Sequence, residues 1–215
     1  LTKTQTRSLN EIIEDLNKNH PMNRLLEGDV GSGKTVIAAI AAILTAQKSK
    51  QVALMAPTEV LAIQHLSTFK KVFGEYLKSE KIGIGILTSG LKTKDKRDIK
   101  SKIISGEIKI IIGTHSLIQK DLIFNDLGLI IIDEQHRFGI EQRGALVKSE
   151  VSHLNETNKI LPHFLSMSAT PIPRTLALTL FGDLDLSIID ELPKGRKPII
   201  TKLVASGFYL LEYII

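Results

Sequence analysis

The stretch Gly28-Asp-Val-Gly-Ser-Gly-Lys-Thr35 decides the fold of this chain of 215 residues. It fits the pattern G-x-x-x-x-G-K-[ST] at every fixed position. Leu25 and Leu26 precede it, and an Ala- and Ile-rich stretch at residues 36–44 follows it. A strand, a glycine-rich turn and a helix in this order present backbone N–H groups and the amino end of a helix to phosphate. The sequence therefore predicts an α/β protein that binds a nucleoside triphosphate.

Each part of this loop has a physical role. Gly31 and Gly33 let the backbone turn tightly. Lys34 places a positive charge at the β- and γ-phosphates, and the Thr35 hydroxyl can ligate Mg²⁺. The alternative interpretation is a glycine-rich turn with a surface lysine, and the flanking apolar run and helix argue against it. The residues predicted to bind the nucleotide are Gly28, Asp29, Val30, Gly31, Ser32, Gly33, Lys34 and Thr35.

Outward from this loop, short apolar runs alternate with helix-like stretches along the chain. The runs that predict strands are 24–26, 51–56, 82–87, 108–112, 127–132 and 164–167. The stretches that predict helices are 34–47, 59–77, 92–104, 142–148 and 173–180, preceded by an amphipathic helix over Leu9, Ile12, Ile13 and Leu16. Strands that alternate with helices form right-handed crossovers. We therefore expect a mostly parallel central sheet with helices on both faces.

The chain length predicts one large domain, which we place at residues 1–192. The stretch Leu192-Pro-Lys-Gly-Arg-Lys-Pro198 is rich in Pro, Gly and charge, and it is the best candidate for a domain boundary. Residues 193–215 are expected to form a linker and an aberrant or truncated tail. Because the chain does not begin with Met, we also expect it to be part of something longer.

The composition excludes several classes of function. The chain has no cysteine, which excludes a disulfide scaffold, a zinc site with Cys ligands and a cysteine nucleophile. It has no apolar run near the roughly 18 residues that a membrane-spanning helix needs, and no signal-peptide pattern at its start. We therefore expect a cytoplasmic protein with no membrane partner. The formal charge of +5 is compatible with an anionic partner but is weak evidence for one.

A second motif lies where an apolar run ends in two carboxylates, Leu129-Ile-Ile-Ile-Asp-Glu134. A strand that is buried on both faces delivers its last side chains to the carboxyl edge of the sheet, where ligands bind in open α/β folds. Asp133 would hold Mg²⁺, and Glu134 would orient or deprotonate the attacking water. A solvated strand end is the alternative. Together with the phosphate loop, the motif favours hydrolysis of the nucleotide.

The tetrapeptide Asp133-Glu-Gln-His136 resembles the D-E-x-H box of superfamily-two helicases and translocases. The other motifs of that superfamily are present in order, at Gln5, Ala56-Pro-Thr-Glu-Val-Leu-Ala-Ile-Gln64, Thr88-Ser-Gly90, Gly113-Thr-His115 and Ser168-Ala-Thr170. Several ordered motifs at sensible spacing are far more specific than one. The resemblance implies a RecA-like P-loop NTPase sandwich that uses ATP and Mg²⁺ and acts on DNA.

The resemblance also implies a role for each matching residue. Gln5 would read the adenine edge, and Thr35 and Asp133 would hold Mg²⁺. The implied catalytic residues are Lys34, Asp133, Glu134 and Gln135. The residues that would couple hydrolysis to DNA contact are His136, Ser168, Ala169 and Thr170. The implied DNA contacts are Thr58, Ser89, Thr114 and His115.

Longer matches narrow the resemblance to the RecG branched-DNA helicases. They are Asp133-Glu-Gln-His-Arg-Phe-Gly139, Met167-Ser-Ala-Thr-Pro-Ile-Pro-Arg-Thr175 and Ile189-Asp-Glu-Leu-Pro-Lys-Gly-Arg196. In that family, ATP hydrolysis drives translocation on duplex DNA, and stalled forks and Holliday junctions are remodelled in recombination and repair. Transcription-repair coupling translocases, which typically carry Glu at the position of Gln135, are one alternative. A degraded fragment that is not an enzyme is another.

The resemblance covers about residues 1–204, which match the first RecA-like motor domain of the family. The second RecA-like domain, with its arginine finger, and the oligonucleotide-binding wedge have no match in these 215 residues. An arginine finger contributes roughly 10³–10⁵ in rate in other NTPases. We therefore expect the chain alone to bind ATP weakly, to hydrolyse it very slowly and to unwind nothing. We also expect it to be a monomer.

Two groups of residues outside these motifs have less specific interpretations. The run at residues 92–102 carries six basic and two acidic side chains, and we expect a solvated helix face with DNA contact as the alternative. His65, His153 and His163 have no metal-ligand spacing with one another. We therefore interpret these histidines as structural or surface residues.

Overall fold

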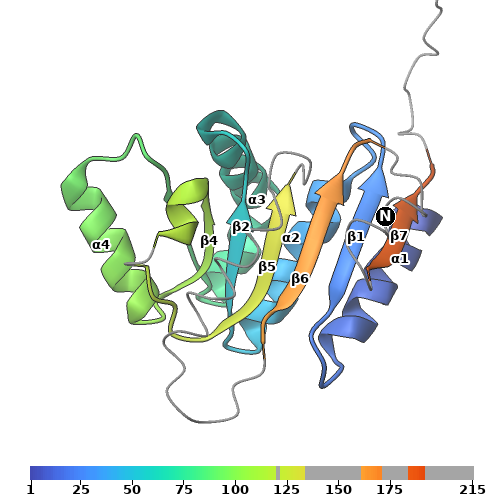
Figure 1. Ribbon diagram of the computed structural model, residues 1–215, viewed down its shortest axis with the longest axis horizontal. Coiled ribbons are helices and arrows are strands. Elements are labelled where there is room, and N and C mark those ends of the chain that lie inside the picture. The colour runs from blue at the N-terminus through green and yellow to red at the C-terminus, as the bar shows by residue number, and fades with distance from the viewer. Residues whose placement is uncertain (120–121, 134–160, 171–183, 192–215) are drawn as a thin grey trace, which may run out of the picture.

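The computed structural model describes residues 1–119, 122–133, 161–170 and 184–191, and the strands in this part of the chain form one seven-stranded sheet (Figure 1). Its order is β3-β4-β2-β5-β6-β1-β7, and all neighbouring strands are parallel. The strands are β1 (Asn23–Gly28), β2 (Gln51–Met55), β3 (Gly83–Leu87), β4 (Ile108–Gly113), β5 (Leu127–Asp133), β6 (His163–Ser168) and β7 (Asp185–Ile189). The predicted α/β class and parallel sheet are confirmed.

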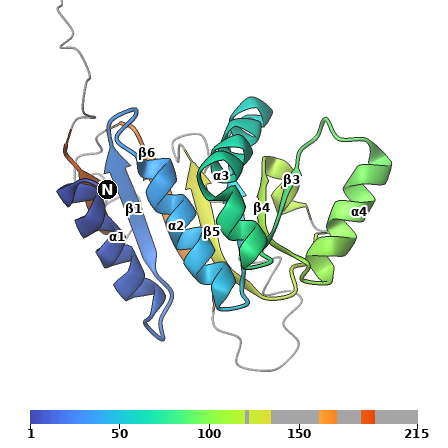
Figure 2. The same cartoon turned by 180° about the vertical axis from the view of Figure 1, so that it is seen from behind.

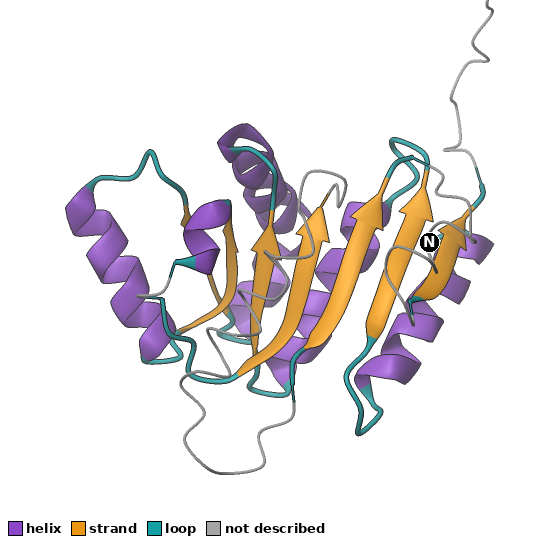
Figure 3. Cartoon of the chain, viewed as in Figure 1, coloured by secondary structure: helices purple, strands orange, loops and turns teal. Residues whose placement is uncertain are grey.

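Helices pack on both faces of this sheet (Figures 2 and 3). They are α1 (Lys3–Leu16), α2 (Lys34–Gln47), α3 (Glu59–Ser79), α4 (Thr93–Ile104) and the 3₁₀ helix η1 (His115–Ile118). Alternate residues of β2 separate the two cores. Val52 and Leu54 belong to the core under α1, α2 and α3, whereas Ala53 and Met55 belong to the core under α4 and η1. This alternation follows from the two-residue period of a strand.

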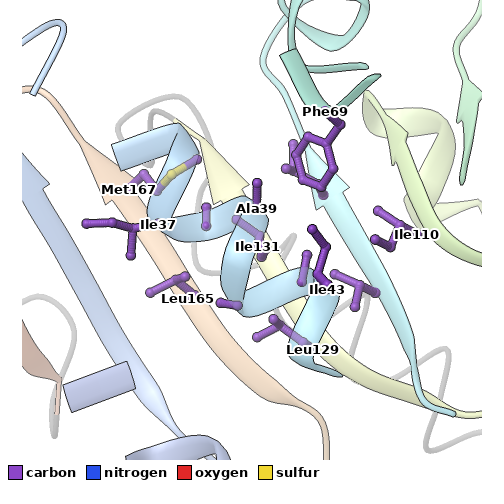
Figure 4. Packing of buried hydrophobic residues seen from close by; sticks show 14 of the residues in the cluster. Ile37, Ala39, Ile43, Phe69, Ile110, Leu129, Ile131, Leu165 and Met167 are labelled. Atoms are coloured by element: carbon purple, nitrogen blue, oxygen red, sulfur yellow. The ribbon is translucent and has the colours of Figure 1, made fainter. Parts of the chain in front are cut away.

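The helix that follows the phosphate loop is held firmly against the sheet (Figure 4). Ile37 and Ile43 of α2 are buried among Ile131 of β5 and Leu165 and Met167 of β6. Each fully buried Leu or Ile side chain contributes roughly 1.5–3 kcal/mol relative to an exposed one. The apolar face of α2 therefore fixes the amino end of this helix, and with it the loop that precedes it.

The structure also contains elements that the sequence analysis did not predict. β7 carries an exposed Asp185 and the polar Ser187, so it lacks the continuous apolar run of the other strands. The helix η1 is only four residues long. Helix α1 begins at Lys3, earlier than its apolar pattern indicated, because Thr2 and Gln5 form a capping box at its amino end.

Some of the elements predicted from the sequence fall on residues that the structure does not describe. The predicted helices at 142–148 and 173–180, and the predicted boundary and tail after residue 192, lie outside the described residues. No helix within the described ranges is long and apolar enough to cross a membrane.

His163 gives the fold a pH dependence. Its Nδ1 accepts a hydrogen bond of 3.0 Å from the backbone N–H of Met22. Burial lowers the pKa of His163, with Lys48 and His20 acting in the same direction and Asp15 opposing them. Because the unfolded chain then binds a proton more readily than the folded one, the contribution of His163 to stability is present above pH 6.5 and is lost as the pH falls below it.

We expect His163→Asn to remove this dependence, since its side-chain oxygen keeps an acceptor for Met22 but does not titrate. Urea unfolding at several pH values between 5 and 8 checks the prediction. The wild-type chain should lose more stability below pH 6.5 than the variant. Parallel pH profiles of the two proteins would contradict it.

Candidate active site

The carboxyl ends of β1, β5 and β6 bring the two predicted nucleotide motifs to one edge of the sheet (Figure 1). β6 lies between β1 and β5, and Met167 of β6 is in register with Leu26 of β1 and with Asp133 of β5. Asp133 therefore lies level with the end of β1, two strand spacings or about 10 Å away. The phosphate loop follows β1 directly, so the loop and the carboxylate share one edge.

The phosphate loop adopts the tight turn that its glycines were predicted to allow. Gly31 has φ 80° and Gly33 has φ 95°, a region that residues with a Cβ rarely enter. A Cβ at Gly28 would lie 2.6 Å from the Ser32 Oγ, so the end of β1 also leaves no room for a side chain. The backbone is therefore wrapped closely enough to surround a phosphate group.

Three features of this loop fit a triphosphate. No side chain caps the amino end of α2, where the helix dipole is positive. The Lys34 Nζ lies over the loop and donates to the carbonyl oxygens of Gly28, at 2.6 Å, and Asp29, at 3.0 Å. The Ser32 Oγ is buried and has no hydrogen-bond partner among the described residues. Phosphate oxygens would pair with this cation and would accept hydrogen bonds from the helix terminus and from the Ser32 hydroxyl.

Two oxygen ligands suitable for Mg²⁺ lie at the same edge. Thr35 is the second residue of α2, and Asp133 is the last residue of β5. Mg²⁺ prefers hard oxygen ligands and is usually held by one or two protein groups together with the substrate phosphates. This pair of residues therefore fits the metal that the sequence predicts.

Gln5 contacts the phosphate loop from α1. Its Nε2 donates to the Ser32 carbonyl oxygen at 2.7 Å, and its Oε1 accepts from the Thr2 backbone N–H at 2.9 Å. A Cβ at Gly33 would lie 2.5 Å from the Gln5 Nε2, which shows how closely the side chain covers the turn. The structure thus brings Gln5 to the nucleotide loop. Its reading of adenine stays a prediction.

The four residues predicted to contact DNA lie around one polar cavity. The cavity has a volume of about 370 Å³. It is formed after the carboxyl ends of β2, β3 and β4, which are neighbours in the sheet. The residues that line it are Pro57, Thr58, Glu59, Ser89, Thr114, His115, Ser116 and Gln119. We call this feature the polar cavity.

Hydrogen bonds hold the wall of the polar cavity in place. The Thr58 side chain caps α3 by accepting from the Leu61 backbone N–H at 3.3 Å. Thr88, at the end of β3, donates to the Glu59 Oε1 at 2.9 Å. A Cβ at Gly90 would lie 2.6 Å from the same oxygen, so the turn after β3 packs closely on Glu59. The Glu59 carboxylate thereby links the start of α3 to the turn after β3.

Helix α4 places positive charge beside the polar cavity. The Lys96 Nζ donates to the Ser89 carbonyl oxygen at 2.7 Å, and the Lys100 Nζ donates to the Gln119 Oε1 at 3.3 Å. Both acceptor residues line the cavity. The basic run at 92–102 therefore supplies two lysines at the margin of the cavity in addition to a solvated face.

The motif at the end of β6 lies between the phosphate loop and Asp133. Ser168 is buried, and its Oγ accepts from the Thr170 backbone N–H at 3.2 Å. Ala169 is half-buried between these two residues. Because β6 pairs with both β1 and β5, these residues lie between the two nucleotide motifs, and their coupling role stays a prediction. Glu134, Gln135 and His136 lie outside the described residues.

The sequence analysis did not find the partners of two buried residues, His65 beside Asp133 and Arg24 near the amino end of β1. His65 is buried on α3, and its Nε2 lies 2.7 Å from the Asp133 Oδ2. Its place on the apolar side of the helix, three residues after Ala62 and four before Phe69, was a usable signal for burial but not for its partner. Arg24, buried in β1, binds Asp15 of α1 at 2.7 Å.

Comparisons with known proteins agree with this geometry. Residues 2–179 match the DEAD/DEAH box helicase family. The chain is 50% identical over 203 residues to the ATP-dependent DNA helicase RecG of Aquifex aeolicus, covering 94% of this chain and 24% of that protein. It is 49% identical over 204 residues to RecG of Haemophilus influenzae, covering 95% and 28%. A solved structure of RecG bound to a three-way DNA junction superposes with a TM-score of 0.75 and 41% identity, covering 93% and 25%.

These relatives are much longer than the chain. The chain spans about a quarter of the length of the RecG proteins that it matches. The resemblance to RecG that the sequence motifs indicated is confirmed.

Proposed function

The chain belongs to the DEAD/DEAH box helicase family, and on this premise we propose that it is the ATP-binding motor unit of a RecG-like helicase that remodels branched DNA. The proposed activity is the reversal of stalled forks and the processing of Holliday junctions in recombination and repair. We infer that it acts in the cytoplasm, with DNA and a second RecA-like domain as its partners and without self-association.

The observation that carries this proposal is the arrangement of one sheet edge. The phosphate loop and Asp133 lie after β1 and β5, and the polar cavity lies after β2, β3 and β4. A nucleotide site and a second polar site are thus built on strands of one rigid sheet. The 50% identity to RecG supports DNA as the occupant of the second site.

At the nucleotide site, the loop residues would bind and orient ATP. Lys34, the amino end of α2 and the loop N–H groups would hold the phosphates, and Thr35 and Asp133 would hold Mg²⁺. When bound, Mg²⁺ neutralises the charge that develops on the phosphate oxygens. Glu134 would take a proton from the attacking water, assisted by Gln135, and Gln5 would contact the adenine.

At the polar cavity, side chains from three loops would contact the DNA backbone. Thr58, Ser89 and Thr114 offer hydroxyl groups, and His115 offers an imidazole. Lys96 adds positive charge at the margin. We infer that His136, Ser168, Ala169 and Thr170 couple the nucleotide state to DNA contact, and the pairing of β6 with the strands that precede both nucleotide motifs supports a role of Ser168, Ala169 and Thr170 in sensing that state.

A chimeric helicase tests the proposed function. The segment of Haemophilus influenzae RecG that matches this chain over 204 residues is replaced by the matching residues of this chain. We expect ATP hydrolysis stimulated by a three-way junction to stay within about tenfold of the parent protein, a barrier change of about 1.4 kcal/mol at most. Steady-state hydrolysis and junction unwinding are measured with and without DNA.

Two controls make the result interpretable. The same chimera with Lys34→Ala reports the background, and its unfolding transition reports whether the exchanged segment is folded. A folded chimera that binds Mg-ATP but shows no junction-stimulated hydrolysis would contradict the proposed function.

A further inference from the structure

His65 connects α3 to the proposed Mg²⁺ ligand Asp133. Its Nε2 lies 2.7 Å from the Asp133 Oδ2, although 68 residues separate the two in the chain. Both side chains are largely buried, with exposed fractions of 8% and 13%. An ionised carboxylate can only accept a hydrogen bond, so the ring N–H of His65 donates to it.

This hydrogen bond restricts how the carboxylate can rotate. Asp133 ends β5, where the backbone is fixed by pairing with β6. With Oδ2 bound to His65, the carboxylate has one preferred orientation at the sheet edge. Residues that hydrogen-bond a metal-ligating carboxylate orient it, and their loss lowers metal affinity or activity by about 10–100-fold.

The helix that carries His65 begins at the polar cavity. Thr58 caps α3, and Glu59 is its first residue; both line the cavity. His65 lies seven residues after Thr58, which is about two helical turns or roughly 10 Å along the axis. Ala62 and Phe69 are fully buried on either side of His65 along the same helix. A helix that packs on the sheet through its buried side therefore joins the polar cavity to Asp133.

We propose that His65 is a positioning residue for Asp133, and that α3 is the connection through which DNA in the polar cavity alters Mg²⁺ binding at the nucleotide site. This inference rests on the proposed function and deepens it. A displacement of the amino end of α3 by DNA moves His65 relative to β5, and the carboxylate follows its hydrogen-bond partner.

The first arm of the test measures Mg²⁺ dependence without DNA. The affinity of the 215-residue chain for a fluorescent ATP analogue is determined in Mg²⁺ and in EDTA. We expect His65→Leu to reduce the gain in affinity that Mg²⁺ provides by about 10–100-fold and to leave the affinity in EDTA unchanged. His65→Gln retains an N–H donor and should restore part of the gain.

A packing control separates positioning from stability. Phe69→Leu changes the same buried side of α3 one turn further on. It should lower the midpoint of urea unfolding without changing the ratio of the affinities in Mg²⁺ and EDTA. If His65→Leu behaves like Phe69→Leu, with lower stability and an unchanged ratio, the positioning role is overturned.

The second arm adds a synthetic three-way DNA junction. Coupling between two sites is reciprocal. If the junction alters the affinity of the chain for Mg-ATP, Mg-ATP must alter the affinity of the chain for the junction by the same factor. We expect this mutual effect in the wild-type chain and its loss in His65→Leu, with junction affinity in EDTA unchanged. A junction effect that persists in His65→Leu, or a wild-type chain that binds Mg-ATP and junction independently, overturns the coupling.

The outcomes also distinguish this inference from the proposed function. A wild-type chain that binds neither Mg-ATP nor the junction overturns the proposed function, and this inference with it. A wild-type chain that binds both, and whose His65→Leu variant keeps the full Mg²⁺ gain and the junction effect, overturns only the role of His65.

Discussion

Lys34→Ala in the chimeric helicase is expected to lower junction-stimulated ATP hydrolysis about 10²–10³-fold, the usual effect of removing one preorganised electrostatic group from an active site. The Lys34 Nζ is placed by the Gly28 and Asp29 carbonyl oxygens over the loop that would hold the phosphates. The transition state spreads negative charge over the γ-phosphate oxygens, and a nearby ammonium stabilises that charge more than it stabilises the ground state. Steady-state hydrolysis under saturating junction measures the effect.

The structure indicates that this loss would not be a loss of fold. The loop contacts of Lys34 are half-buried or exposed, so we expect the free energy of unfolding to change by less than about 1 kcal/mol. Lys34→Arg keeps the charge on a larger, planar group, and we expect it to remain strongly impaired. Hydrolysis within tenfold of the unmodified chimera in Lys34→Ala would contradict the assignment of this lysine.

Arg24→Met is expected to destabilise the chain by about 3 kcal/mol, the lower end of the loss seen when one partner of a buried ion pair is removed. The Arg24 Nε donates to the Asp15 Oδ2 at 2.7 Å, and its Nη1 donates to the Ser187 Oγ at 2.9 Å. This one side chain therefore joins α1, β1 and β7. Lys18 still contacts Asp15 at 2.7 Å in the variant, which limits the loss. Urea unfolding at pH 7 gives the measurement.

The pH dependence of stability gives a second test, because the pKa of the Asp15 carboxyl fixes the direction of the effect. Burial acts to raise the pKa of Asp15, but hydrogen bonds from Lys18 and Arg24 outweigh it, and the pKa is lowered. The contribution of Asp15 to stability is thus present above its unfolded pKa of 3.8 and is lost as the pH falls through the lower folded value. The acid-induced loss should be smaller in Arg24→Met.

A double variant checks the mechanism. Arg24→Met combined with Asp15→Leu replaces the ion pair by two apolar side chains, a change that is often neutral in buried sites. We expect it to recover most of the stability lost in Arg24→Met. A double variant less stable than Arg24→Met would show that the cost arises from packing and not from the loss of the guanidinium partner of Asp15.

The parts of the fold that the sequence predicted are those encoded locally. The phosphate loop is specified by eight consecutive residues, and the apolar run before Asp133 forms a strand wherever a sheet can bury both faces. Thr58, Ser89 and Thr114 follow three different runs, and parallel pairing of those runs is sufficient to bring them to one edge.

The parts that the sequence did not predict depend on contacts between distant segments. The helical phase of His65 indicates a buried residue but not that Asp133 is its partner. Arg24 stands between Asn23 and Leu25 near the start of a strand, and nothing local shows that α1 and β7 supply its acceptors. β7 itself is an edge strand with polar alternation, so its pattern is weaker than that of the central strands.

The place of β1 in the sheet has a consequence for how the molecule forms during synthesis. β1 lies between β6 and β7, with Arg24 in register with Leu165 on one side and Asp185 on the other. Both neighbours leave the ribosome long after β1, so this early strand waits with both edges unpaired. Pairings so distant in sequence form slowly, and unpaired edges invite association with other chains. The nucleotide loop, which follows β1, is therefore among the last features to be completed. A nascent chain that ends before β7 has the greatest need of a chaperone.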